Sequence, residues 1–333
     1  MPIDVHAHYV PLDILEPLVA DAAAYGVSIV ETAPGCQCLH FATGTQVRPF
    51  FAKLVEPVAD RLASMDRTGI DRQILSIWTD IFGYGLPAAQ GVRWHELLND
   101  ALARFAAREP ARFSWLASGH LADPQAAARE LERRVTRDGA VGAVVAANIE
   151  GTNLGEVDLD PYWACAQSLG VPVFIHPAAP GPTPRTRFFA LNQVVQYTFD
   201  TTLCVGSLIG AGVLDRFPRL ELILSHGGGA LPWLAGRFDC MHGRMDRAQQ
   251  RHVAQQSPSH YLTRLTYDTI LHDPSALRWL VDRVGADRIV IGSDDSFPPA
   301  DHDPLATLAA TGLDAATIAR IADGNPRRLF RLP

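Results

Sequence analysis

This sequence has no long hydrophobic run, and its number of cysteines is odd. No stretch approaches 18 uninterrupted apolar residues, and the longest are strand-sized or broken by glycine, proline or a charge. Because a transmembrane helix needs roughly 20 predominantly apolar residues, no membrane span is expected. The first six residues lack the charged and apolar segments of a secretory signal. The five scattered cysteines argue against a disulfide framework and favour the reducing cytoplasm.

Excess positive charge is missing as well. The chain has 29 lysines and arginines against 36 aspartates and glutamates, which gives a formal net charge of −7 at pH 7. A mildly acidic protein has no broad basic field to attract phosphate backbones, so nucleic acid is not an expected partner. Local basic groups can still bind a small anionic substrate. With 47% hydrophobic residues, the 333-residue chain can bury a large core.

Eight short segments rich in β-branched and apolar residues alternate with helical patterns. The segments are residues 3–10, 72–79, 113–121, 140–148, 171–177, 220–227, 265–271 and 288–294. Several are near-continuous apolar runs, which is typical of parallel strands covered on both faces. Eight repeats of strand and helix predict an α/β protein folded as a (β/α)8 TIM barrel. An open doubly wound sheet is the alternative, but its glycine-rich dinucleotide turn is not found.

The intervening helices are expected from the spacing of their apolar residues. They cover residues 95–108, 158–169, 230–250, 274–284 and 313–322, together with a helix that Asp123 caps and Pro124 begins. About sixty residues separate the first two strands, far more than a βα connection needs. We therefore predict one domain over residues 1–333, with an insertion at approximately 11–58 that carries a hairpin or lid and covers the active-site mouth.

Five ionisable side chains lie at the ends of the expected strands. Active sites of such barrels lie at the carboxyl ends of the strands. His6 and His8 are two residues apart and share one strand face. His176, His226 and Asp294 end three later strands. One histidine at a strand end is usually structural, but five converging groups predict a catalytic site for a zinc-like divalent ion.

The motifs around these residues resemble the amidohydrolase superfamily. The similarity is greatest to its decarboxylase branch, typified by α-amino-β-carboxymuconate-ε-semialdehyde decarboxylase, and covers nearly the whole chain. It rests on His6-Ala7-His8, His176-Pro177, Ser225-His226-Gly227-Gly228-Gly229-Ala230 and Gly292-Ser293-Asp294, and on residues 65–70, 97–100, 110–113, 272–274 and 324–326. Each motif is short, and the combination is what makes the resemblance specific.

The resemblance implies a metal set and an acid–base group. His6, His8, His176 and Asp294 would bind one divalent metal ion, with Zn preferred and Mn as the alternative. Water would complete the shell, and His226 would move protons beside it, so His226 and Asp294 are the expected catalytic residues. The branch uses this machinery to release carbon dioxide from an acid.

The substrate contacts follow from the same resemblance. Arg48 and Arg237 match arginines that bind the substrate, and an arginine fork suits a carboxylate. Because the match to Arg237 enters from the neighbouring subunit, a homodimer is implied. Phe297 is expected to line the pocket. Aromatic residues of the family are absent from residues 178–181 and 191–194, which leaves the identity of the acid open.

The leading prediction is a carbon–carbon lyase, a metal-dependent non-oxidative decarboxylase. Its substrate would be a small unsaturated or aromatic carboxylic acid, either carboxymuconate-semialdehyde-like or an ortho-substituted benzoate. The alternative is a metal-dependent hydrolase of a lactone, ester or amide. The strand at 140–148 has no lysine to be carbamylated, which favours a single-metal centre. Cys36, Cys38 and His40 form an incomplete second ligand set and are better explained as a substrate-covering loop.

Overall fold

Eight parallel strands form the centre of the molecule in the computed structural model, which describes residues 1–33, 36–178, 181, 183–244 and 253–333. The sheet has the order β1-β5-β6-β7-β10-β11-β12-β13, and all seven neighbouring pairs in it are parallel. The strands are β1 (Ile3–His8), β5 (Arg72–Ser76), β6 (Phe113–Ala117), β7 (Gly142–Ala146), β10 (Val173–His176), β11 (Leu222–Leu224), β12 (Thr266–Asp268) and β13 (Ile289–Val290).

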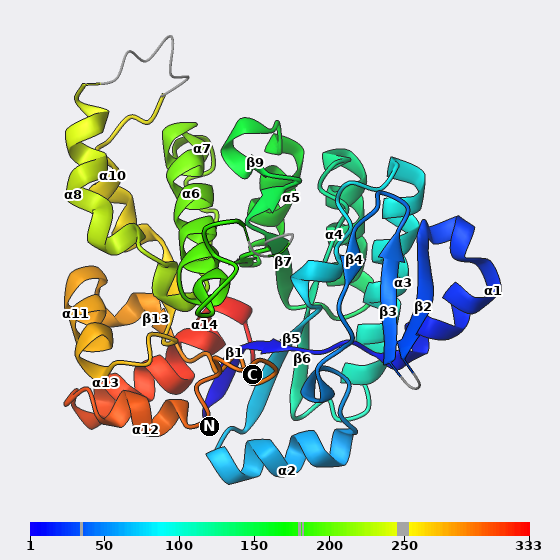
Figure 1. The fold of residues 1–333 in the computed structure, drawn as a ribbon. Helices are drawn as coiled ribbons and strands as arrows, with labels where there is room; N and C mark the ends of the chain where they lie inside the picture. Colours follow the sequence, from blue (N-terminus) through cyan, green and yellow to red (C-terminus); the bar gives the residue numbers. More distant parts are fainter. Residues whose placement is uncertain (34–35, 179–180, 182, 245–252) are drawn as a thin grey trace.

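Backbone hydrogen bonds join the last strand to the first. The Val5 N–H donates to the Ile291 carbonyl at 2.9 Å, and the Asp294 N–H donates to the His6 carbonyl at 2.8 Å. The sheet therefore closes on itself, with helices around it (Figure 1). The predicted (β/α)8 TIM barrel is confirmed.

Helices follow most of the strands and form the outer layer. They are α1 (Leu15–Tyr25), α2 (Val58–Thr68), α3 (Ala88–Ala106), α4 (Pro124–Arg137), α5 (Asp160–Leu169), α6 (Tyr197–Gly210), α7 (Val213–Arg216), α8 (Leu231–His242), α10 (Pro258–Tyr261), α11 (Pro274–Val284), α12 (Pro304–Ala309), α13 (Ala315–Ala319) and α14 (Asn325–Phe330). None of the described helices is long and apolar enough to cross a membrane.

Most predicted helices are present, although some of their ends differ. The Asp123 side chain accepts a hydrogen bond from the Ala126 N–H at 2.9 Å and caps α4, as predicted. Helix α3 begins at Ala88, directly after Pro87 at its N-cap. The sequence predicted a start at residue 95, because Gly91 weakens the apolar pattern of the first turns. Helix α8 ends at His242, and residues 245–250 of the predicted helix lie outside the described part of the chain.

The segment between β1 and β5 contains helix α1 and a three-stranded antiparallel sheet. This small sheet has the order β2-β3-β4, with β2 (Val27–Ala33), β3 (Cys36–Phe41) and β4 (Gln46–Val47). It lies beside α3 (Figure 1), where the Phe41 and Trp94 rings are 6.1 Å apart. A second small hairpin, β8 (Asn148–Ile149) with β9 (Thr152–Asn153), follows β7.

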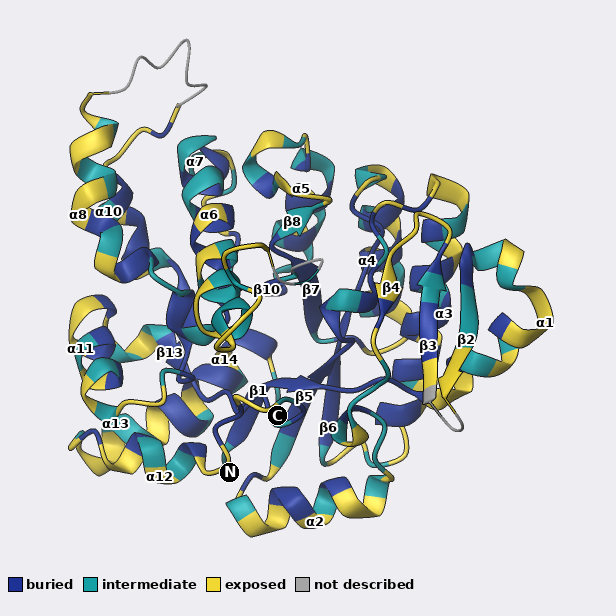
Figure 2. Ribbon diagram, in the orientation of Figure 1, coloured by how far each residue is buried: buried dark blue, intermediate teal, exposed yellow. Residues whose placement is uncertain are grey.

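The barrel strands are buried on both faces, whereas the helices expose their outer sides (Figure 2). Val144, Phe174 and Ile223, on three neighbouring strands, are almost completely buried. Such two-sided burial explains why these strands are near-continuous apolar runs in the sequence. It also makes the few polar residues on the strands conspicuous, since burying them requires partners.

Arg61 ties helix α2 to the carboxyl end of β1. This fully buried guanidinium donates to the carbonyl oxygens of His8 and Lys53 at 2.9 and 3.0 Å, and to the Gln73 side-chain oxygen at 2.9 Å. The contact to the His8 carbonyl fixes the backbone at one of the predicted metal ligands. Arg61 therefore contributes both to stability and to the position of the site.

We expect Arg61→Leu to lower the free energy of unfolding by about 3 kcal/mol, because buried acceptors lose a charged donor. Urea unfolding followed by circular dichroism measures the change. Arg67→Leu, at an exposed position of the same helix, is the control and should change stability by less than about 0.5 kcal/mol. Equal effects of the two substitutions would contradict this role of Arg61.

Candidate metal centre and active site

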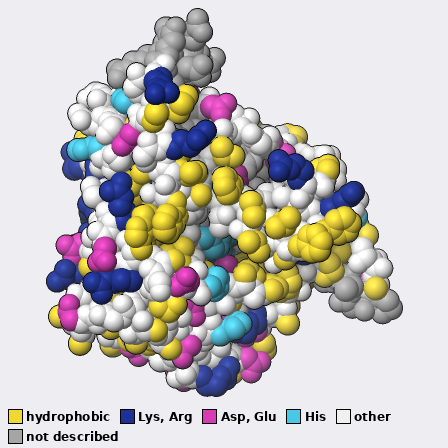
Figure 3. Space-filling model, turned by 60° about the vertical axis from the view of Figure 1, so that its left-hand side comes forward, with side chains coloured by type: hydrophobic (Ala, Val, Ile, Leu, Met, Phe, Trp, Pro, Cys, Tyr) yellow, Lys and Arg dark blue, Asp and Glu magenta, His cyan; other side chains and the backbone are white. Residues whose placement is uncertain are grey.

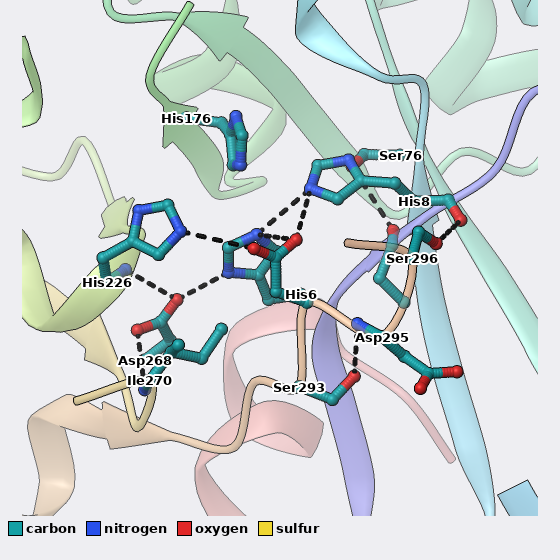
Figure 4. Close-up of polar contacts among 12 residues, drawn as sticks. His6, His8, Ser76, His176, His226, Asp268, Ile270, Ser293, Asp295 and Ser296 are labelled. Carbon is teal, nitrogen blue, oxygen red and sulfur yellow. Dashed lines mark hydrogen bonds and ion pairs between the residues drawn. The ribbon is translucent and has the colours of Figure 1, made fainter. Parts of the chain in front are cut away.

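The five ionisable residues predicted from the strand ends lie together at the carboxyl ends of their strands, and Figure 4 shows the four histidines of this set. His6 and His8 come from β1, His176 ends β10, and His226 and Asp294 follow β11 and β13. His226 is the most accessible, with 15% of its side chain exposed. The other four residues are buried. The structure thus brings together the five residues that the sequence singles out, and their roles as metal ligands and acid–base group remain predictions.

Their potential ligand atoms lie close together. The Nε2 atoms of His6 and His8 are 3.1 Å apart, and the Asp294 Oδ1 atom lies 3.4 Å from the first and 3.5 Å from the second. One ligand atom each from His6, His176, His226 and Asp294 lies within 4.8 Å of the others. Ligand atoms about 2.0–2.2 Å from a common ion are separated by roughly 3–3.5 Å. The spacing of 3.1–3.5 Å among the atoms of His6, His8 and Asp294 therefore fits a divalent metal ion, and His176 lies within the wider limit of 4.8 Å.

Hydrogen bonds on the far side of two imidazoles orient them toward this space. His6 Nδ1 is 2.7 Å from the Asp268 carboxylate, and His8 Nδ1 is 3.0 Å from the Ser76 hydroxyl. When each Nδ1 carries the donated proton, the Nε2 lone pair is left to face the other ligands. Such partners are typical of metal-binding histidines, in which they fix the tautomer and the ring direction.

His176 is oriented in the same way. Its Nδ1 atom lies 2.8 Å from the Pro177 carbonyl and 2.9 Å from the Thr79 hydroxyl, which itself donates to that carbonyl. Its Nε2 atom and Asp294 Oδ1 are both buried and make no hydrogen bond to any residue that the structure describes. Buried polar atoms without partners are uncommon, and a cation would satisfy both.

The electrostatics of the site favour a positive charge beside Asp294. Burial alone would lower the pKa of His6, but the Asp294 charge and the hydrogen bond to Asp268 raise it to about 10. Burial and the His6 charge lower the pKa of His8 to about 3. Burial opposes ionisation of Asp294, yet the positive charge of His6 and the hydrogen bond from His226 to Asp294 Oδ2 hold the pKa of this carboxyl well below its usual range. A divalent ion supplies the positive charge that this carboxylate requires.

Backbone strain accompanies the site. His226 and Asp294 both have φ of 54°, in the left-handed region that non-glycine residues rarely adopt. The turn at His226 is held because Asp268 accepts hydrogen bonds from the N–H groups of His226 and Gly227 at 2.9 and 2.8 Å. A side chain at Gly229 would collide with the Thr198 carbonyl, so glycine is needed where this turn meets α6.

Three side chains that orient the site were not predicted from the sequence: Asp268, Thr79 and Ser76. Asp268 is the most informative, because it ends β12 and is completely buried. It lies within the predicted strand 265–271, where a search for polar residues at strand ends could have identified it. Ser76 and Thr79 give a weaker signal, since hydroxyl residues are frequent in strands and turns for other reasons.

A cavity of about 600 Å³ opens beside the ligand cluster. Figure 3 shows histidine side chains deep in a hollow bordered by hydrophobic side chains. Among the residues that line the cavity are Arg48, Trp78, Asp80, His176, Tyr197, His226, Trp233, Asp294 and Phe297. The guanidinium carbon of Arg48 lies 4.4 Å from the centre of the Phe51 ring and 5.3 Å from the centre of the Trp78 ring. A small aromatic or unsaturated ligand can therefore be enclosed between the cluster and Arg48.

Two of the predicted substrate-binding residues line this cavity, and the third does not. Arg48 and Phe297 both line it, with the Phe297 ring 5.3 Å from that of His8. Arg237 is exposed on α8 and is not among the described residues that line the cavity. Within a single chain the structure does not bring Arg237 to the site.

We expect Asp268→Asn to lower the affinity for a divalent metal by about 10- to 100-fold, because His6 loses its anionic partner. Competition with a chromogenic chelator measures the affinity, and metal content after dialysis confirms it. Asp282→Asn, at an exposed position of α11, is the matched control. An unchanged affinity in Asp268→Asn would refute this role of Asp268.

Comparison with known proteins gives relatives across almost the whole chain. The amidohydrolase family model matches residues 3–332. A 2-amino-3-carboxymuconate-6-semialdehyde decarboxylase from Dictyostelium discoideum is 28% identical over 298 residues, covering 89% of this chain and 82% of that protein. A gamma-resorcylate decarboxylase from a Polaromonas species is 30% identical over 302 residues, covering 84% of this chain and 89% of that protein.

Solved structures agree with this relationship. The 5-carboxyvanillate decarboxylase from Sphingomonas paucimobilis has a TM-score of 0.81 at 24% identity, covering 100% of this chain and 99% of its own. A dihydroxybenzoic acid decarboxylase from a Polaromonas species, solved with manganese and the inhibitor 2-nitroresorcinol, has a TM-score of 0.78 at 24% identity, covering 99% and 97%. At this identity the likeness supports the fold. Since the family model spans residues 3–332, the chain belongs to the amidohydrolase family.

Proposed function

We propose that this protein is a metal-dependent non-oxidative decarboxylase of a small unsaturated or aromatic carboxylic acid. The observation that carries the proposal is the cluster of His6, His176, His226 and Asp294, with His8 Nε2 3.1 Å from His6 Nε2, beside a cavity that Arg48 lines. Hydrogen bonds orient the imidazoles of His6, His8 and His176. Relatives named as decarboxylases support the reaction type. We further propose that residues 1–333 form one domain with an insertion at approximately 11–58.

One divalent ion would be held by His6, His8, His176 and Asp294. Zinc is our first choice, because histidine nitrogens with one carboxylate and an open position are typical of catalytic zinc. Manganese is the alternative, since a related structure contains it. When bound, the ion supplies a Lewis acid that stabilises negative charge on substrate oxygens.

Arg48 would bind the carboxylic acid. It makes no ion pair with any residue that the structure describes, so its guanidinium is available to a ligand in the cavity. The aromatic rings of Phe51 and Trp78 beneath it hold the planar group in place. A carboxylate can accept two parallel hydrogen bonds from such a group.

His226 would transfer the proton. Its Nε2 atom is 3.5 Å from Asp294 Oδ2, and its Nδ1 atom is buried without a described hydrogen-bond partner. Loss of carbon dioxide leaves an electron pair on the carbon that carried the carboxylate, and a proton held by His226 can be delivered to it. Asp294 would act as both a metal ligand and the partner that orients His226.

Arg237 would act from the neighbouring subunit of a homodimer. Its exposed position on α8, away from the cavity of its own chain, supports this arrangement.

The isolated cysteines Cys38, Cys165 and Cys204 support a reducing, cytoplasmic setting, since none of them is in a disulfide.

The decarboxylase proposal predicts that the metal-loaded protein releases carbon dioxide from at least one ortho-hydroxy or ortho-amino aromatic acid or a carboxymuconate-type dienoic acid. Mass spectrometry of each reaction mixture measures the loss, and a chelator should abolish it. His226→Ala should retain the metal while kcat falls by about 10²- to 10⁴-fold. Gain of water on a lactone, ester or amide, with every acid unchanged, would assign the chain to hydrolysis.

The subunit proposal predicts complementation between two inactive variants. His226→Ala and Arg237→Ala should each be inactive alone. In a hybrid dimer one site keeps both residues, so refolding an equal mixture should restore roughly a quarter of the wild-type activity. Gel filtration verifies that a dimer is present. If both residues act within one chain, the mixture will stay inactive.

A further inference from the structure

Asp80 is a second charged group in the cavity, and the function proposed above assigns it no role. It lies in the short 3₁₀ turn η3 (Thr79–Ile81) after β5, next to the residue that positions His176. Its side chain is partly buried and lines the same cavity as Arg48. The carboxyl group therefore belongs to the wall that a substrate would contact.

This carboxyl group has no partner in the described part of the chain. Asp80 makes no side-chain hydrogen bond or ion pair there, whereas nearby Asp200 accepts from the Asn148 amide and the Ala178 N–H. Burial raises the pKa of Asp80 to about 7, and the positive charge of Arg48 opposes that rise. A partly buried carboxyl without a donor is costly in the free protein, so a ligand that supplies one would be favoured.

Arg48, Asp80 and Tyr197 together form what we call the polar wall of the cavity. Burial and the charge of Asp80 raise the pKa of Tyr197, so its hydroxyl stays neutral. The polar wall thus combines a cation, a carboxyl group and a hydroxyl. A ligand carboxylate can pair with Arg48, while Asp80 requires a hydroxyl or amino donor on the same ligand.

A second carboxylate on the ligand would be placed differently. Near Arg48 it would also lie near Asp80, and above pH 7, where the Asp80 carboxyl is ionised, the two anionic groups would repel each other. Asp80 partly neutralises the field of Arg48, so the polar wall has less attraction for a dianion than an isolated arginine would have. The arrangement of Arg48 and Asp80 therefore distinguishes between monocarboxylic and dicarboxylic acids, which are both compatible with the proposed decarboxylase.

We infer that Asp80 determines specificity, selecting aromatic monocarboxylic acids that carry a hydroxyl or amino donor over dicarboxylic acids. The inference rests on the proposed function and deepens it, because it assigns the choice of substrate to one residue. Asp80 would contact the substrate substituent and would leave the metal centre unchanged.

The test compares wild type, Asp80→Asn and Asp80→Leu on 2,6-dihydroxybenzoate and on benzene-1,2-dicarboxylate. Calorimetry measures binding of both compounds, and carbon dioxide release gives kcat/KM. Wild type should bind the dihydroxy acid at least about tenfold more tightly, and Asp80→Leu should lose that preference. Asp80→Asn, which keeps an acceptor oxygen without the charge, should retain part of it and bind the dicarboxylate more tightly. Asp71→Asn, exposed before β5, is the control.

The outcomes separate this inference from the proposed function. If wild type binds the dihydroxy acid through Asp80 but releases carbon dioxide from no acid, the decarboxylase proposal fails and the binding inference holds. If both Asp80 variants retain metal and melting temperature yet keep the wild-type ratio of affinities within twofold, the inference is overturned. A wild-type preference for the dicarboxylate would overturn it as well.

Discussion

The rest of the site depends on the hydrogen bonds that the Asp268 carboxylate accepts. Its Oδ2 atom accepts hydrogen bonds from His6 Nδ1 and the His226 N–H, and its Oδ1 atom accepts from the N–H groups of Gly227 and Ile270. One buried anion thereby fixes the His6 imidazole, which we propose as a metal ligand, and the strained turn that carries His226, the proposed acid–base residue. Its own burial is tolerated because both oxygens are saturated with donors, and these contacts outweigh burial and lower its pKa.

The closed barrel turns distant parts of the sequence into neighbours. His6 and Asp294 are almost at opposite ends of the chain, yet the hydrogen bond from the Asp294 N–H to the His6 carbonyl places the segment after β13 beside β1. Parallel strands all end at the same rim, so each can contribute one polar residue while its interior stays apolar. Buried Asp4 reinforces the closure, because it accepts hydrogen bonds from both the N–H and the hydroxyl of Ser293.

The fold and the ligand cluster were predictable because both follow from simple periodicities. Alternation along β1 puts His6 and His8 on one face, and the strand-end rule adds His176, His226 and Asp294. Asp268 obeys the same rule and could have been found. The start of α3 was not predictable from its apolar pattern. The lack of a partner for Asp80 depends on which side chains surround it in three dimensions, and no spacing in the sequence encodes that.

The ligand cluster and the polar wall both line the cavity, but their electrostatic environments differ. At the ligand cluster, Asp294 is held ionised by neighbouring positive charge, so this end is built to receive a cation and anionic oxygens. At the polar wall, Arg48 and Asp80 both line the cavity, neither has a described ionic partner, and burial raises the pKa of Asp80 to about 7. A substrate that satisfies both ends must present an acid group together with a neutral donor. The shape of the barrel sets where chemistry occurs, and the unpaired charges on its rim decide which acid can enter.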